Sequence, residues 1–293
     1  MEVKKTRVAL VQLSTNCCPQ ENLTSFKTEI LRAIRGGAKF ILTPEVTNFL
    51  TSDHQFRLAN ACVDDNDFFI KSAKHFCYNY NVWILIGSLV YKVGETGKCV
   101  NRSILIGPTG EIAAQYDKIH MFDVNLGPDQ TFKESDYYQP GSKSVLVGTD
   151  IGTIGMTICY DLRFPSLYTK LASKGANIIV VPSAFTKFTG ELHWQILLQA
   201  RAIETGCFIL APAQCGLHKG TNRESYGHSM IISPQGQVIS SLGSEPGICI
   251  GDINIEECLE ARLKIPNLLN QRSFDLQYFP ILGLKGTSKT EIN

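Results

Sequence analysis

The sequence predicts an α/β protein, because continuous apolar runs alternate with helically spaced segments and two matching hairpins interrupt the alternation. The apolar runs cover residues 8–13, 40–42, 82–86 and 178–181. They do not alternate with polar residues, as expected for strands that are covered on both faces. Hydrophobic residues make up 44% and charged residues 19% of the 293-residue chain, so a large core is expected and disorder is excluded as its main state.

Helical spacing separates these strands. Pro19 opens a segment whose apolar residues share one face: Phe26, Ile30, Ala33 and Ile34. A later segment, 192–205, carries Leu192, Ile196, Leu197, Ala200 and Ile203, and Gly206 closes it as a C-cap. Strand and helix therefore alternate along the chain, which is typical of α/β proteins.

The two hairpins cover residues 104–112 and 230–238. Each has an apolar triplet, an x-Pro-x-Gly-x turn and a second strand. Proline fixes φ at such a turn and glycine accepts a positive φ. This repetition predicts two similar halves, with two sheets related by pseudo-twofold symmetry and covered outside by helices. Because no linker or charge run divides the chain, we expect one domain over 1–280, followed by a polar C-terminal tail, 281–293.

Charge and hydropathy limit the partners. The 28 basic and 27 acidic residues give a net charge of +1, which offers no electrostatic footprint for nucleic acid or an anionic membrane. The apolar run near the N-terminus is too short for a signal-peptide core, and no stretch approaches the roughly 20 apolar residues of a membrane span. We therefore expect a soluble, intracellular protein that binds neither nucleic acid nor membrane.

Ten cysteines are spread over the chain without a CxxC pair, so zinc-ribbon and thioredoxin-like sites have no support. Their number favours a reducing compartment, the cytoplasm, with a mitochondrial pool left open. Most are interpreted as small hydrophobes, as for Cys207, Cys215 and Cys249. Cys17 and Cys18 lie in a loop after the first strand, where they face either a site or solvent.

Cys159 differs from the others because it ends a strand, residues 155–159, and precedes a polar turn and a helix start near Pro165. Loops at the carboxyl ends of strands are where α/β proteins place their sites. The backbone N–H groups that follow, beginning with Tyr160, are suited to binding an oxyanion. A nucleophilic cysteine needs a base or a cation. None of the six histidines stands in a pattern that marks it as that partner, so a Cys–His pair stays open.

Three other residues are candidates for charge chemistry. Glu45 follows the short strand at 40–42, and its apolar surroundings predict a raised pKa, suited to a general base; the alternative is a carboxylate at a helix start. Lys118 ends the second strand of the first hairpin, either as a surface ammonium or as a cation for an oxyanion and a thiolate. Glu134, alone, is an ordinary loop glutamate.

Taken together, Pro44-Glu45, the segment 116–120 (Tyr-Asp-Lys-Ile-His) and the segment 158–165 (Ile-Cys-Tyr-Asp-Leu-Arg-Phe-Pro) strongly resemble the nitrilase superfamily of carbon–nitrogen hydrolases. The resemblance covers residues 6–280. It implies a four-layer α-β-β-α sandwich, a Glu-Lys-Cys triad of Glu45, Lys118 and Cys159, a supporting Glu134 and a Tyr160 N–H at the oxyanion. It also implies a homodimer or higher homo-oligomer, and neither a cofactor nor a metal, since lysine supplies the cation.

Further segments resemble the Nit-type amidases (182–185, 189–194 and 200–205) and, within them, the deaminated-glutathione amidases (213–216 and 223–229). One departure is Ser166, where the family often has glutamate after Phe-Pro. The implied reaction is hydrolysis of a small carboxylate-bearing amide, deaminated glutathione, through a thioester with release of ammonia or an amine. Lys219 and Arg223 are candidates for binding the substrate carboxylate, or else they are solvated loop charges.

Three alternatives remain open at this point. The first is an ω-amidase that acts on α-ketoglutaramate. The second is a non-catalytic binding protein on the same fold, although no triad residue is missing. The third is a cysteine redox sensor, which would require a resolving thiol close to Cys159.

Overall fold

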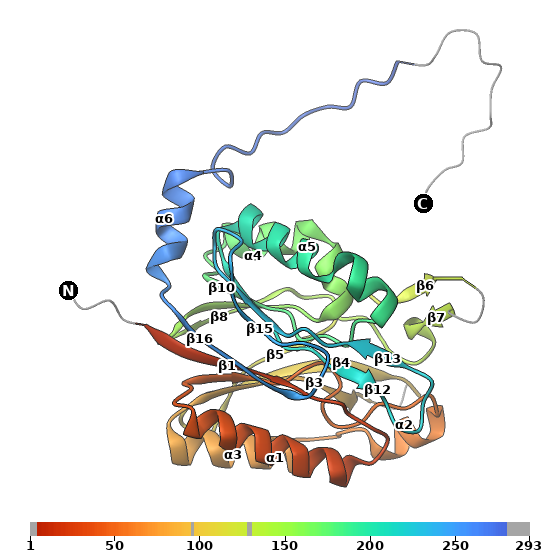
Figure 1. The fold of residues 1–293 in the computed structure, drawn as a ribbon. Coiled ribbons are helices and arrows are strands. Elements are labelled where there is room, and N and C mark those ends of the chain that lie inside the picture. The colour runs from red at the N-terminus through yellow and green to blue at the C-terminus, as the bar shows by residue number, and fades with distance from the viewer. Residues whose placement is uncertain (1–4, 95–96, 128–130, 280–293) are drawn as a thin grey trace, which may run out of the picture.

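The computed structural model places two β-sheets face to face between two layers of helices (Figure 1). It describes residues 5–94, 97–127 and 131–279. In Figure 1, α1 and α3 cover one sheet from below, and α4 and α5 cover the other from above. The four-layer sandwich predicted from the sequence is therefore confirmed. The predicted polar tail, 281–293, lies outside the described residues.

Within the described chain, each main sheet has six strands. The first sheet has the order β16 (Gly247–Ile253), β1 (Thr6–Gln12), β2 (Phe40–Leu42), β3 (Trp83–Lys92), β4 (Cys99–Ile106) and β5 (Ile112–Asp117). The second has the order β15 (Val238–Ser241), β14 (Met230–Ile232), β11 (Phe208–Ala211), β10 (Ile178–Val180), β9 (Gly152–Met156) and β8 (Val145–Thr149). Two small antiparallel ribbons pair β6 (Asp123–Asn125) with β7 (Thr131–Lys133), and β12 (Cys215–Leu217) with β13 (Glu224–Tyr226).

The helices are α1 (Pro19–Arg35), α2 (His54–Asn60), α3 (Phe68–Tyr80), α4 (Pro165–Ser173), α5 (Lys187–Thr205) and α6 (Glu256–Lys264). Two short 3₁₀ turns are η1 (Glu134–Asp136) and η2 (Cys159–Arg163). Pro19 and Pro165 each stand in the first turn of a helix, where the missing N–H removes no hydrogen bond. Among the described residues, no helix is both long and apolar enough to cross a membrane.

The strand order supports the predicted two-halves arrangement. Strands β1, β2 and β3 run parallel, as do β9, β10 and β11. Each trio continues into an antiparallel pair, β4–β5 or β14–β15, and these pairs are the two predicted hairpins. An antiparallel strand, β16 or β8, closes the other edge of each sheet. The two sheets therefore share one topology, and their hairpins occupy corresponding places.

The interpretation of the segment 192–205 needs one correction. A helix is present and ends at Gly206, whose φ of 59° is left-handed as predicted, but α5 begins earlier, at Lys187. Its inner face is formed by residues such as Trp194 and Leu198, whereas Leu192, Ile196 and Ile203 are 53%, 69% and 57% exposed. Helical spacing identifies an apolar stripe but not what covers it. On α5 the stripe at Leu192 faces away from the sheet.

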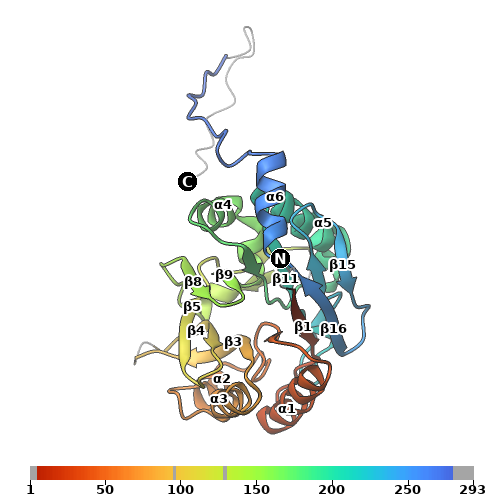
Figure 2. The same cartoon turned by 90° about the vertical axis from the view of Figure 1, so that its left-hand side faces the viewer.

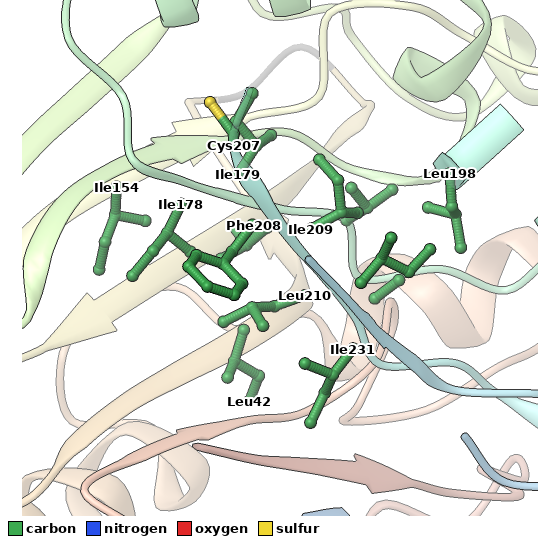
Figure 3. Close-up of a cluster of buried hydrophobic side chains, with 14 of the residues drawn as sticks. Leu42, Ile154, Ile178, Ile179, Leu198, Cys207, Phe208, Ile209, Leu210 and Ile231 are labelled. Atoms are coloured by element: carbon green, nitrogen blue, oxygen red, sulfur yellow. The ribbon is translucent and has the colours of Figure 1, made fainter. Parts of the chain in front are cut away.

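The core lies in layers that match the sandwich. Between the sheets, Leu42 of the first sheet packs with side chains of the second, among them Ile178, Phe208 and Ile231 (Figure 3). A second apolar cluster fills the space between the first sheet and helices α1 and α3, as expected for strands that are covered on both faces. The continuous apolar runs in the sequence are thus explained by burial on both sides.

The segment 266–279 follows α6 and forms no helix or strand. It extends away from the sandwich in both views (Figures 1 and 2). Several of its apolar side chains are exposed, including Leu269 at 83% and Phe274 at 91%. The chain's own body therefore leaves this apolar segment uncovered.

The inter-sheet core supports a stability prediction. We expect Phe208→Ala to lower the free energy of unfolding by about 3–5 kcal/mol, because the ring is fully buried and its loss leaves a cavity. Urea unfolding measures this change. The control Leu217→Ala, at a side chain that is 64% exposed, should shift it by less than about 0.5 kcal/mol. Equal effects from the two variants would contradict the placement of Phe208 in the core.

Candidate active site

Four residues far apart in the sequence line one cavity. Glu45 follows β2, Lys118 follows β5, Glu134 begins η1 and Cys159 begins η2. The cavity has a volume of about 650 Å³, and Tyr160 and Arg223 also line it. The structure therefore brings together every predicted residue except Lys219, which is exposed and does not line the cavity.

Lys118 lies between two carboxylates. Its Nζ donates to Oε1 of Glu45 at 2.9 Å and to the two carboxylate oxygens of Glu134 at 2.9 and 2.8 Å. The lysine and Glu45 side chains are 2% and 4% exposed. Glu134 is held in turn by the backbone N–H of Phe122, which donates to Oε2 at 2.7 Å. Lys118 is therefore not a surface ammonium, and Glu134 is not an ordinary loop glutamate.

The side chain and the backbone of Glu45 are both held by the second half of the sandwich. The N–H of Ala184, just after β10, donates to Oε2 of Glu45 at 2.8 Å. The side chain of Gln214, which is buried, donates to the carbonyl oxygen of Glu45 at 2.8 Å. The next residue, Val46, has a φ of 51°, a conformation that branched side chains rarely adopt. The chain turns here without starting a helix, so the helix-start alternative for Glu45 is wrong.

Asn101 belongs to the same cluster and was missed from the sequence. Its side-chain Nδ2 donates to Glu45 Oε1 at 2.8 Å, and its backbone carbonyl oxygen accepts from the backbone N–H of Lys118 at 2.9 Å. Asn101 lies in β4 and is 1% exposed. An amide in a strand whose other residues are mostly buried is the signal that could have found it, because such a group needs partners.

Cys159 sits at a strained turn. It is buried and has a φ of 48°, so the chain reverses direction sharply after β9. Its N–H donates to the carbonyl oxygen of Pro182 at 2.9 Å. This contact attaches the turn to the loop after β10, next to the Ala184 N–H that holds Glu45. The predicted elbow at the end of a strand is present.

Asp161 holds this turn in place. Its Oδ2 accepts from the hydroxyl of Tyr116 at 2.6 Å and from the N–H of Ile158 at 2.9 Å. Its Oδ1 lies 2.7 Å from Nδ1 of His120 and accepts from the His120 N–H at 3.1 Å. Asp161 is completely buried. It thereby joins the cysteine turn of the second half to the residues on both sides of Lys118 in the first.

The charges of the cluster shift the pKa values of its members. Burial alone would raise the pKa of Glu45, but the charges of Lys118 and Arg223 outweigh it and hold this pKa below its ordinary value of 4.5. Burial would lower the pKa of Lys118, yet Glu134 and Glu45 raise it well above 10.5. Burial and the negative charge of Glu45 raise the pKa of Cys159. At neutral pH the cluster therefore holds a carboxylate, an ammonium and a neutral thiol.

The predicted raised pKa of Glu45 is thus wrong. The prediction considered the apolar strand beside Glu45 but not the ammonium that lies 2.9 Å from its oxygen. A buried cation at that distance favours the ionised carboxylate more strongly than burial disfavours it. Glu45 is consequently ready to accept a proton without first losing one.

The other residues singled out in the sequence as candidates for chemistry lie outside the cavity lining. No histidine in the described part of the chain lines the cavity. The same part holds no group of three His, Cys, Asp or Glu side chains suited to a metal ion. Neither Cys17 nor Cys18 lines the cavity. Ser166, the departure from the family pattern, is exposed in the first turn of α4 and also lies outside the cavity lining.

Residues 7–263 match the family model described as carbon-nitrogen hydrolase. The chain belongs to the carbon-nitrogen hydrolase family. A curated relative from Synechocystis sp., "Deaminated glutathione amidase", is 38% identical over 91% of this chain and 98% of its own length. The resemblance to the nitrilase superfamily is therefore confirmed, and the protein is a hydrolase acting on non-peptide carbon–nitrogen bonds.

Two solved structures in this family share the fold. Nit3 of Saccharomyces cerevisiae, a member of branch 10 of the nitrilase superfamily, is 28% identical, with a TM-score of 0.82, and covers 92% of this chain and 96% of its own. A variant of the amidase from Nesterenkonia sp. AN1 is 25% identical, with a TM-score of 0.75, over 91% and 94%. That structure shows covalent addition of the acetamide moiety of fluoroacetamide at its active-site cysteine.

The depressed pKa of Glu45 predicts how its contribution to stability depends on pH. A carboxyl whose folded pKa is depressed stabilises the fold fully above its unfolded pKa, here 4.5, and loses that effect as pH falls through the folded pKa. We expect Glu45→Gln to lower the free energy of unfolding by about 3 kcal/mol between pH 6 and 8, because it removes one carboxylate from a buried ion pair. The loss should shrink below pH 4.5.

Urea unfolding of both proteins from pH 3 to 8 measures this difference. The exposed residue Glu111 supplies the matched control, and Glu111→Gln should change stability by less than about 0.5 kcal/mol at every pH. A destabilisation by Glu45→Gln that already disappears between pH 6 and 7 would show that the pKa of Glu45 is raised rather than depressed.

Proposed function

We propose that this hydrolase is a cysteine-dependent amidase that cleaves a small carboxylate-bearing amide, deaminated glutathione, through a thioester. The observation that carries the proposal is the cluster at the cavity, where a buried carboxylate, an ammonium and a thiol meet. These are a base, a cation and a nucleophile within one pocket, as covalent amide hydrolysis requires.

In the first step, Cys159 Sγ attacks the amide carbonyl while Glu45 takes the thiol proton. Because the pKa of the thiol is raised and that of Glu45 is lowered, the free thiol does not ionise by itself, and proton transfer accompanies bond formation. The carbonyl oxygen gains the negative charge. An ammonium has three N–H donors. We assign one to Glu45 and one, shared, to the two oxygens of Glu134. The third Lys118 N–H and the backbone N–H of Tyr160 are then assigned to this oxyanion.

In the second step, the carbon–nitrogen bond breaks and Glu45 returns the proton to the departing nitrogen, which leaves as ammonia or an amine. A thioester on Cys159 remains. Glu45 then takes a proton from water, the hydroxide adds to the thioester carbonyl, and the acid departs as the thiol is restored. Glu134 keeps Lys118 charged and in place throughout the cycle, since both its oxygens contact Nζ.

The comparisons support the proposed nucleophile and the proposed substrate separately. The covalent adduct at the active-site cysteine of the Nesterenkonia amidase supports a nucleophilic role for Cys159. The name of the Synechocystis relative supports deaminated glutathione as the substrate. Arg223 fits such a substrate, since it lines the cavity and its guanidinium donates to the carbonyl oxygen of Ala184 at 2.6 Å, beside Glu45.

All ten cysteines lie within the described residues and are free thiols. We propose a reducing compartment, the cytoplasm, for this protein, because a catalytic thiol among so many others is liable to disulfide exchange elsewhere.

The nucleophile is tested by Cys159→Ala. We expect at least a 1,000-fold lower kcat for hydrolysis of deaminated glutathione, on the order of the loss seen when a catalytic nucleophile is removed. Release of α-ketoglutarate and cysteinylglycine, followed by chromatography, measures it. The control Cys18→Ala removes a thiol outside the cavity lining and should leave kcat within about twofold of wild type. Near wild-type activity in Cys159→Ala would exclude the mechanism.

The substrate is tested by comparing two amides. We expect kcat/KM for deaminated glutathione to exceed that for α-ketoglutaramate by at least tenfold, because the cavity of about 650 Å³ leaves room beyond a five-carbon amide. Both assays use the same enzyme preparation and report α-ketoglutarate. The reverse preference would make the protein an ω-amidase, while no turnover of either, together with no selective alkylation of Cys159, would indicate a binding protein.

We further propose that the chain forms a homodimer through the exposed apolar stripe of α5 (Leu192, Ile196 and Ile203) together with α6 and the segment 266–279. An isologous dimer covers the same patch on both copies. The net charge of +1 opposes such self-association only weakly. The segment 266–279 extends beyond the chain's own sandwich (Figure 1), and in the proposed dimer the second copy covers its exposed apolar side chains.

Light scattering after size exclusion tests the dimer. Wild type should elute with the mass of two chains, and Ile196→Glu should shift it towards one chain, since an unpaired charge in a buried interface is costly. Lys71→Glu, on the opposite helical layer, is the control and should leave the mass unchanged. A wild-type mass of one chain would refute this proposal.

A further inference from the structure

Helix α2 buries a charged side chain and leaves its apolar side chains partly or fully exposed. Its single buried residue is Arg57, which is 5% exposed, while the other positions are exposed or half-buried. The helix lies at the end of the sandwich that also carries the β6–β7 and β12–β13 ribbons, on the right of Figure 1. Arginine is among the residues least often buried without a charged partner.

The contacts of Arg57 leave its charge uncompensated. Its Nη2 donates to the carbonyl oxygen of Thr51 at 2.7 Å, and its guanidinium carbon lies 4.5 Å from the ring centre of Tyr137 and 5.5 Å from that of Tyr138. Its Nη1 is buried and has no hydrogen-bond partner. Among the described residues no carboxylate forms an ion pair with it. A buried, unpaired guanidinium is unfavourable unless something else binds it.

Arg57 faces the space where substrate would lie. It lines the catalytic cavity and also an adjoining pocket of about 390 Å³, which Lys133 and Asp136 line as well. The position of Tyr138 shows how Arg57 relates to the reacting groups. Burial is the main reason that the pKa of this tyrosine is raised to about 12. The positive charge of Arg57 acts against this rise, and the negative charges of Glu134 and Glu45 add to it. Tyr138 thus lies within reach of both.

Arg57 and Arg223 hold different places. Arg223 is close enough to Glu45 to lower the pKa of that carboxyl, so it sits beside the reacting centre. Arg57 donates to the carbonyl oxygen of Thr51, lies against the rings of Tyr137 and Tyr138, and lines the adjoining pocket as well as the cavity. It is therefore set back from the scissile bond, where the far end of an extended substrate would reach.

We propose that Arg57 binds a carboxylate of the substrate and selects for amides that carry one at a distance from the cleaved bond. A guanidinium is a strong N–H donor to a carboxylate, and the unpartnered Nη1 leaves such a donor free here. The inference rests on the proposed function, since deaminated glutathione has two such carboxylates, one on its keto-acid half and one on its glycine. The aromatic rings of Tyr137 and Tyr138 hold the guanidinium plane in position.

The test compares Arg57→Met with wild type on three amides: deaminated glutathione, its glycinamide form, and uncharged valeramide. We expect kcat/KM for deaminated glutathione relative to valeramide to fall about 10- to 150-fold in the variant, as for loss of a charge-assisted hydrogen bond. If the glycinamide form shows the same fall, Arg57 binds the keto-acid carboxylate; if the fall disappears, it binds that of glycine. Equal losses on deaminated glutathione and valeramide would overturn the proposal.

The control is Lys170→Met. Lys170 is an exposed lysine of α4 that lines neither pocket, so this variant should leave the selectivity ratio unchanged. Thermal unfolding separates binding from a structural role. Because methionine replaces a buried charge that lacks a partner, the melting temperature of Arg57→Met should equal or exceed that of wild type. A lowered melting temperature with unchanged selectivity would make Arg57 structural and reject the inference.

A binding measurement that needs no hydrolysis tests this inference separately from the proposed substrate. Glutarate, which has carboxylates but no scissile amide, should slow alkylation of Cys159 by iodoacetamide in wild type and much less in Arg57→Met. If wild type fails to hydrolyse deaminated glutathione while this difference persists, the carboxylate site stands and the substrate assignment falls. Equal protection of the two proteins, or protection of neither, would remove the carboxylate site.

Discussion

The buried ammonium of Lys118 is the constraint on which the site depends. Removing an amine cation from water costs several kcal/mol, and only close carboxylates offset that cost. Glu45 and Glu134 supply them from two separate segments, one after β2 and one at the start of η1. The lysine therefore fixes where both segments lie, and each carboxylate in turn keeps the lysine charged. The contacts that keep Lys118 charged are therefore the same contacts that hold these two segments in place.

The second half of the chain meets this cluster through backbone and carboxylate contacts rather than through more charge pairs. The Ala184 N–H reaches Glu45, and Asp161 ties the cysteine turn to Tyr116 and His120, on both sides of Lys118. The packed inter-sheet core holds the halves at the spacing that these hydrogen bonds require. Because interiors are close-packed, a shift of one sheet against the other would break several of them at once. Cys159 and Glu45, the proposed nucleophile and base, thus belong to different halves and still line one cavity.

Much of this arrangement could be predicted from the sequence, and the misses have physical causes. Continuous apolar runs identified β1, β2, β3 and β10, and three short motifs placed Glu45, Lys118 and Cys159 at chain turns. The pKa of Glu45 was predicted with the wrong sign, because the distance to Lys118 is set by two sheets and not by local sequence. Asn101 and Arg57 were missed since each is polar within a segment whose neighbours give no motif. The stripe on α5 was recognised, but whether it faces the sheet or another molecule is a property of packing.

The state of the cysteine at rest has a consequence for oxidative chemistry. Peroxides react with thiolates, and their reaction with neutral thiols is slow. The same burial and Glu45 charge that raise the pKa of Cys159 therefore shield its sulfur from sulfenic acid formation while the cavity holds no amide. In the proposed mechanism the thiolate forms only as Cys159 attacks an amide carbonyl, so no thiolate stands open to peroxide between turnovers.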